Sequence, residues 1–180
     1  SPTSNRPAHR RAIPGTILKV YSSMNVYQVT AENDPYYALY QLCRATEGVD
    51  YIGSLPQPAL ARELKHATSL VYPNTFAETS CIAVLEAMAS GCLVITSDLG
   101  ALPETTAGFG HLMPIPSDKT LHAGMFTELA VRVLQDAHAA PTRHAARLEQ
   151  QVRMVNQSGT WTVRAREWHD WLTATRSPGR

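Results

Sequence analysis

Short apolar, β-favouring runs alternate along the chain with longer stretches whose apolar residues recur every three or four positions. The short runs predict strands, and the longer stretches predict amphipathic helices. The predicted strands occupy residues 16–21, 48–52, 69–72, 93–96 and 109–113. The predicted helices occupy residues 35–44, 57–66 and 79–90 between the strands, and residues 121–138, 141–156 and 160–176 after them. Because parallel strands need a crossover and a helix is the usual one, this order predicts an α/β domain with a parallel sheet covered on both faces.

The predicted fold also limits where a ligand can bind. In open parallel sheets, ligands lie beyond the carboxyl ends of the strands. Here those ends lead into residues 22–25, 53–56, 73–79 and 97–103. Functional side chains are therefore sought in these segments and at the start of the helix that follows residue 79.

Composition is typical of a soluble globular protein. Of the 180 residues, 44% are hydrophobic and 17% are charged, which suits one domain with a core of its own. We expect this domain to span residues 16–176, between a disordered or truncated lead-in at residues 1–15 and a tail at residues 177–180. A net charge of +1 gives no electrostatic reason to expect a nucleic acid or an acidic membrane as a partner.

Targeting and redox signals favour a cytoplasmic protein. No apolar run reaches the ~20 residues that a transmembrane helix needs, and the N-terminus lacks the pattern of a signal peptide. Cys43, Cys81 and Cys92 are too few for a disulfide framework or a zinc site, so we expect buried thiols in a reducing compartment. The seven histidines show no metal-ligand spacing and are expected at solvated positions or helix ends, so no metal site is predicted.

Glu78 and Glu86 carry the most informative chemistry. They lie eight residues apart where a predicted helix opens after a buried strand, which separates them by about 12 Å at ~1.5 Å per residue. The backbone N–H groups at the start of that helix lack intrahelical acceptors and favour phosphate. Each carboxylate can accept hydrogen bonds from a pair of vicinal hydroxyls. The pattern therefore suits a ligand with hydroxyls at both ends and phosphates between them, such as a nucleotide-sugar.

The simpler alternative is that Glu78 caps the helix and Glu86 makes a surface ion pair. Apolar residues flank Glu86 on both sides, among them Leu85, Ala87 and Met88. A carboxylate in such surroundings is costly unless it has a partner, which favours the ligand interpretation.

Several motifs surround the two glutamates. They are Tyr72-Pro73-Asn74, Glu78-x7-Glu86, Ala87-Met88-Ala89-Ser90-Gly91-Cys92-Leu93-Val94-Ile95 and Leu99-Gly100-Ala101-Leu102-Pro103-Glu104. With these motifs, the stretch from Leu70 to Met113 resembles the donor-binding segment of retaining GT-B glycosyltransferases of the glycosyltransferase family 4 type. The resemblance implies a Rossmann-like three-layer domain, the C-terminal half of a GT-B fold, that ends in several helices.

The resemblance also implies roles for individual residues. Glu78 is implied as the catalytic residue that contacts hydroxyls of the donor sugar, and Glu86 as the ligand of the ribose. A UDP- or GDP-linked sugar is implied as donor, transferred with retention and without a metal or other cofactor. The remaining implied donor-site residues are Thr79, Ser80, Cys81 and Ile82 at the diphosphate, Gly53, Ser54 and Leu55 at the nucleobase, and Asn74 and Glu104.

Two departures from the family pattern affect the function. The glycine-containing loop of the family is Thr79-Ser80-Cys81 here, and the basic pair that follows the family's first strand has no counterpart. We therefore expect that the chain starts at the second strand of the domain and that its partner is an upstream acceptor-binding GT-B domain, without which it is inactive. A non-catalytic, degenerate GT-B module and a nucleotide-sugar epimerase are the alternatives. Trp161, Trp168 and Trp171 are expected to serve the core or domain docking rather than sugar stacking.

Overall fold

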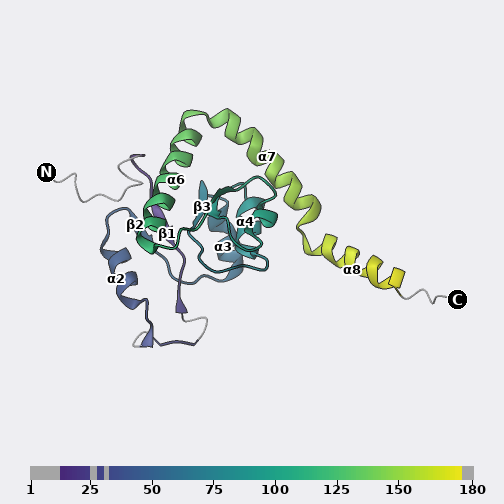
Figure 1. Ribbon diagram of the computed structural model, residues 1–180, viewed down its shortest axis with the longest axis horizontal. Coiled ribbons are helices and arrows are strands. Elements are labelled where there is room, and N and C mark those ends of the chain that lie inside the picture. Colours follow the sequence, from purple (N-terminus) through teal and green to yellow (C-terminus); the bar gives the residue numbers. More distant parts are fainter. Residues whose placement is uncertain (1–12, 25–27, 31–32, 176–180) are drawn as a thin grey trace.

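The computed structural model describes residues 13–24, 28–30 and 33–175. The predicted tail at residues 177–180 and most of the predicted lead-in therefore lie outside the described residues. In the described residues, five strands alternate with helices, and three long helices follow the last strand (Figure 1). The strands are β1 (Leu18–Val20), β2 (Val49–Tyr51), β3 (Ser69–Tyr72), β4 (Leu93–Ser97) and β5 (His111–Met113). The helices are α2 (Tyr37–Ala45), α3 (Gln57–Leu64), α4 (Ile82–Ala89), α5 (Leu102–Thr106), α6 (Lys119–Ala139), α7 (Pro141–Ser158) and α8 (Trp161–Thr175).

All the described strand pairs are parallel, which confirms the predicted α/β class. The strands form two sheets, however, and not one continuous sheet: β1 pairs with β2, and the second sheet has the order β3-β4-β5. β4 is the central strand of the larger sheet, and all five of its residues are buried. This burial on both faces is typical of parallel sheets flanked by helices.

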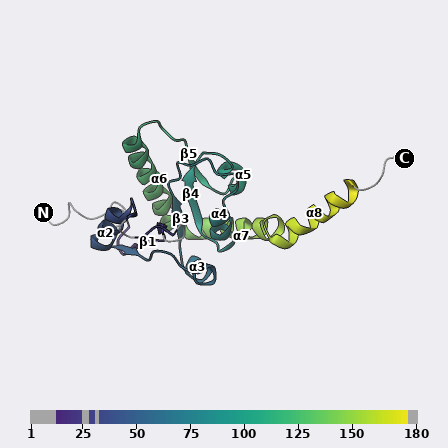
Figure 2. The same ribbon diagram turned by 90° about the horizontal axis from the view of Figure 1, so that it is seen from below.

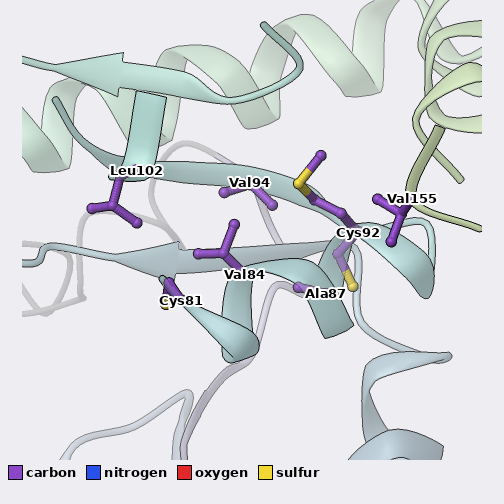
Figure 3. Close-up of a cluster of buried hydrophobic side chains, with 8 residues drawn as sticks. Cys81, Val84, Ala87, Cys92, Val94, Leu102 and Val155 are labelled. Carbon is purple, nitrogen blue, oxygen red and sulfur yellow. The ribbon is translucent and has the colours of Figure 1, made fainter. Parts of the chain in front are cut away.

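Two hydrophobic clusters cover the opposite faces of the larger sheet. In the first cluster, Val94 of β4 packs against Val84 and Met88 of α4, and α5 and α7 each add a buried residue (Figure 3). In the second cluster, Leu93 and Ile95 of β4 pack against α6. Alternate residues of β4 thus face different clusters, as the period of two in a strand requires. Figure 2 shows the resulting layers, with α4 and α6 on opposite sides of β4.

The β1–α2–β2 unit packs largely by itself. Tyr40 of α2 stacks on Tyr51 of β2 with ring centroids 4.8 Å apart, and Arg44 lies over the same ring. Among the described residues, neither hydrophobic cluster includes a member of this unit. A charged contact joins it to α3, where Glu63 accepts hydrogen bonds from Lys19 and Tyr21. The lack of a shared core gives a physical reason for the separation into two sheets.

The predicted helix ends agree with the observed ones only in part. Gly91 follows α4 with a φ of +80°, and its N–H donates to Met88, which confirms the predicted glycine C-cap. The start of α4 was predicted at Thr79 but lies at Ile82, and α5 occupies part of a segment predicted as loop. Thr79 and Ser80 are exposed. Ser and Thr hydroxyls compete for backbone hydrogen bonds outside helices, which favours a later start.

The C-terminal helices differ strongly in burial. α7 contacts α4 closely, and its Gln151 is 1% exposed, with an amide that donates to the carbonyl oxygens of Met88 and Cys92. α8 extends away from both sheets (Figure 1), and its Trp161, Trp168 and Trp171 are exposed. The three tryptophans are therefore not part of the core. In the described part of the chain, no helix is long and apolar enough to cross a membrane.

Candidate functional site

The loop after β3 brings several of the predicted residues together. Asn74, which is 6% exposed, shapes this loop with its side-chain amide. Its Oδ1 accepts from the backbone N–H of Phe76 at 2.8 Å, and its Nδ2 donates to the carbonyl oxygen of the same residue at 2.5 Å. Asn74 thus lies in the predicted site, where its amide group holds the backbone that leads to Glu78.

The backbone of Glu78 is fixed by the loop after β4. The N–H of Ala101 donates to the carbonyl oxygen of Glu78 at 2.8 Å. The adjacent Gly100 has a φ of +57°, and a Cβ at this position would lie 2.6 Å from the same oxygen. A side chain would not fit between these two segments, so glycine allows the close approach.

The side chain of Glu78 is also held. The hydroxyl of Tyr72, the last residue of β3, donates to Oε1 of Glu78 at 2.8 Å. Burial, reinforced by the Glu78 carboxylate, raises the pKa of Tyr72 well above its ordinary value. The hydroxyl therefore stays protonated and acts as a donor at neutral pH.

The N-terminus of α4 follows Glu78 directly. Because the helix begins at Ile82, its first-turn amides are those of Ile82, Ala83 and Val84, and only Ile82 belongs to the predicted phosphate-binding set. Thr79 and Ser80 are exposed in the loop before the helix. Cys81 is the N-cap residue and 5% exposed, and burial raises the pKa of its thiol. The structure thus places a helix N-terminus close after Glu78. The helix starts at Ile82 and not at Thr79, so its free amides belong to later residues than predicted.

Glu86 lies in the second turn of α4 and contacts the start of α3. Nε2 of Gln57 donates to Oε1 of Glu86 at 2.9 Å. Only Pro56 separates Gln57 from the predicted nucleobase loop, residues 53–55, so this contact brings the loop near Glu86. Gly53 is buried against the ring of Tyr51 with a φ of +80°. Ser54 is exposed and Leu55 is half-buried.

Glu104 lies in the first turn of α5, which begins just after the loop that holds Glu78. Its side chain is exposed. The structure therefore places Glu104 on the element next to the site and at a helix start, where a carboxylate is favourable.

Three contacts of the site were not predicted from the sequence. Tyr72 and the Gly100–Ala101 segment contact Glu78, and Gln57 contacts Glu86. A tyrosine at the end of a buried strand, followed closely by a loop carboxylate, is a signal that sequence reasoning could have used. Gly100 belongs to one of the sequence motifs described above. Its contact with Glu78, however, depends on how the loop after β4 packs against the loop after β3, and local sequence does not predict that packing.

The two carboxylates flank a helix N-terminus, and this arrangement sets the chemistry of the site. Glu86 accepts from the side chain of Gln57, and Glu78 is contacted by the Tyr72 hydroxyl and by the Cys81 thiol. A carboxylate offers about four acceptor positions, so capacity remains for ligand hydroxyls. The helix amides between them favour an anion. Within the described residues, no group of three or more His, Cys, Asp or Glu side chains is arranged to hold a metal ion.

Comparison with protein families identifies a match to most of the chain. A protein-family model described as "Glycosyl transferases group 1" matches residues 12–136, from the segment before β1 to most of α6. The matched region covers more than half of the chain and contains both glutamates and all their contacts described above. No curated protein matches the chain.

Proposed function

Because the chain belongs to the glycosyl transferases group 1 family, we propose that it is the donor-binding domain of a retaining glycosyltransferase. Members of this family use nucleotide-sugar donors, and the chain has the Rossmann-like α/β fold of the C-terminal GT-B domain. The proposed donor is a UDP- or GDP-linked hexose. The proposed reaction transfers the sugar to an acceptor bound by another domain.

One observation carries this proposal: Glu78 and Glu86 lie on either side of the N-terminus of α4. Glu86 would accept hydrogen bonds from the ribose hydroxyls, with Gln57 and residues 53–55 close to the base. Glu78 would accept hydrogen bonds from hydroxyls of the sugar. The amides of Ile82 and Ala83, two exposed residues, lie between the two carboxylates along the chain and would contact the diphosphate, whereas Val84 is fully buried. The order sugar, diphosphate and ribose along the donor thus matches the order Glu78, N-terminus of α4 and Glu86 along the chain.

The same residues support a mechanism for sugar transfer. Cleavage of the bond between sugar and diphosphate develops positive charge on the sugar ring and negative charge on the leaving group. In the proposed reaction the N-terminus of α4 stabilises the leaving diphosphate. Glu78 orients the sugar through its hydroxyls, and the diphosphate assists attack by the acceptor on the same face, which retains the configuration.

Exposed tryptophans on α8 support the proposed partner domain. Trp161 is 80% exposed, Trp168 is 62% exposed and Trp171 is 58% exposed. Large aromatic side chains bury substantial area when they dock, so such a surface suits a domain interface. We propose that an acceptor-binding GT-B domain covers α8, and that transfer requires this domain.

Glu86→Ala tests the donor-binding function. Hydrogen bonds to an ionised group contribute about 1.5–3 kcal/mol each, so the variant should bind UDP or GDP about tenfold more weakly, or worse. Titration calorimetry on the 180-residue chain measures this affinity. Glu128→Ala, which removes an exposed carboxylate of α6, is the matched control and should bind as the wild type does. Equal nucleotide affinity for Glu86→Ala and wild type would contradict the proposal.

A further inference from the structure

We propose that Tyr72 is a positioning residue for the sugar end of the donor, because its hydroxyl fixes the Glu78 carboxylate in the orientation that receives the sugar hydroxyls. This role rests on the proposed function and deepens it. Tyr72 is not expected to touch the donor itself. Its effect passes through Glu78.

The main chain on both sides of this contact is anchored. Glu78 is bound through its carbonyl oxygen by Ala101, with Gly100 in close contact. The carbonyl oxygen of Tyr72 accepts from Oγ1 of Thr96 at 2.9 Å and from the N–H of Asn74 at 2.8 Å. The remaining freedom of Glu78 is therefore that of its side-chain torsions.

The Tyr72 hydroxyl restricts those torsions. A glutamate side chain has several rotamers in solution, and a free one would have to be ordered when the donor binds. The Tyr72 ring is half-buried and packs against the first hydrophobic cluster, so the hydroxyl occupies a defined position. It donates to Oε1, which leaves acceptor capacity on Oε2 for the sugar. Glu78 is thus held before the donor arrives.

The chain offers a matched control for this bond. Tyr21 also donates to a glutamate, with its hydroxyl 2.9 Å from Oε2 of Glu63. Burial, with the Glu63 carboxylate, raises the pKa of Tyr21 to about 12, so this hydroxyl is a protonated donor as well. Glu63 lies on α3 and is not a predicted site residue. Tyr21→Phe therefore removes a tyrosine–glutamate bond of the same kind away from Glu78.

The test compares nucleotides with nucleotide-sugars. The affinity for UDP and UDP-glucose, and for GDP and GDP-mannose, is measured by calorimetry on the 180-residue chain. The ratio of the two affinities in each pair is the sugar increment, which reports the sugar end of the donor alone. Tyr72→Phe should reduce the sugar increment about three- to tenfold, as expected for one hydrogen bond, and leave nucleotide affinity unchanged. Tyr21→Phe should change neither quantity.

A double-mutant cycle separates positioning from simple stabilisation. Glu78→Ala should abolish the sugar increment, and Tyr72→Phe should have no further effect in the Glu78→Ala background. Glu78→Asp keeps the charge and the tyrosine ring but withdraws the carboxylate from both the hydroxyl and the sugar, so it should lose at least as much of the sugar increment as Tyr72→Phe does. A smaller loss in Glu78→Asp than in Tyr72→Phe would contradict an effect that passes through Glu78.

The outcomes are distinguishable. Equal losses of nucleotide and nucleotide-sugar affinity in Tyr72→Phe, or a further loss in the double variant, would overturn the positioning role while leaving the donor site intact. A sugar increment that survives in Glu78→Ala would overturn the role of Glu78 and with it that of Tyr72. A wild-type chain that binds neither UDP nor GDP nor their sugars would instead overturn the proposed function.

Discussion

Replacing Gly100 with alanine would place a methyl group against the backbone of Glu78. The new Cβ would lie 2.6 Å from the carbonyl oxygen of Glu78, 2.7 Å from its nitrogen and 3.0 Å from the carbonyl carbon of Ala77. These three atoms are all backbone, so no side-chain rotation relieves the contact. The loop after β4 and the loop before α4 would have to separate.

The expected cost has two sources. A left-handed φ such as the +57° of Gly100 costs an L-residue about 1–2 kcal/mol. Overpacking a well-packed contact adds about 1–3 kcal/mol. Gly100→Ala should therefore lower the free energy of unfolding by about 2–5 kcal/mol, against a typical total of about 5–15 kcal/mol for a domain.

Gly108→Ala gives the first source alone, so the difference between the two variants isolates the second. Gly108 also has a positive φ, of +80°, but a Cβ there meets no atom within 4 Å. It should cost only the backbone part, about 1–2 kcal/mol. Urea unfolding of both variants and the wild type measures the difference, which is the cost of the contact with Glu78.

Measuring the nucleotide-sugar affinity of the same two variants tests the effect on function. Displacement of Glu78 should reduce the sugar increment in Gly100→Ala, whereas Gly108→Ala should bind as the wild type does. If the two variants were equally stable and bound UDP-glucose or GDP-mannose equally well, the inferred role of Gly100 in placing Glu78 would be refuted.

Two further predictions concern parts of the fold away from the glutamates. Gln151→Leu leaves the carbonyl oxygens of Met88 and Cys92 without their buried amide partner, so it should lower the free energy of unfolding by about 1–3 kcal/mol. Gln150→Leu, at the exposed neighbouring position, should lower it little. Equal effects of the two variants in urea unfolding would contradict this prediction. Hydrogen bonds from His144 and Arg143 hold the pKa of Asp136 below its ordinary value, so they stabilise the fold above about pH 4 and lose this effect as the pH falls through the folded pKa. The stability difference between wild type and Asp136→Asn, measured by urea unfolding from pH 7 to pH 3, should therefore shrink on acidification, and a constant difference would argue against the assignment.

The sequence predicted the larger sheet well because its signals are local and consistent. Each strand from residue 69 onward is a short apolar run, and Gly91 marks the end of α4 with the left-handed backbone that glycine favours. The family resemblance of residues 70–113 is confirmed by the match over residues 12–136. The elements before residue 57 were also predicted, but not their separation into a sheet of their own. That separation depends on packing between units, which a hydrophobic pattern does not encode.

The burial of polar residues was not predicted from the hydrophobic pattern either. His144 was expected at a solvated position or a helix end; it lies in the first turn of α7, but it is buried, and its Nε2 bonds to Asp136 at the corner between α6 and α7. Gln151 is buried because two carbonyl oxygens of another element accept from it. In each case a tertiary partner offsets the cost of desolvation, and the partner is distant in sequence or set by a turn.

For the candidate site, sequence reasoning found the two carboxylates but not their supports. The spacing of Glu78 and Glu86 is visible in the chain, whereas Gln57 reaches Glu86 only because α3 begins beside α4. The assignments of all these residues to the donor remain predictions. The structure adds a definite arrangement on which each one can be tested.

The two glutamates are supported by parts of the protein that differ in rigidity. Tyr72, which holds Glu78, packs against the buried core around β4, so local opening at that end should require a large part of the unfolding free energy. Gln57, which contacts Glu86, belongs to α3, and none of the eight described residues of this helix is buried. Local opening of α3 should therefore be easier and more frequent, whereas Glu86 itself lies on α4, whose Val84, Ala87 and Met88 belong to the buried core. In the proposed complex, contacts between α3 and the base would then be lost before the contacts of the two carboxylates with the ribose and the sugar.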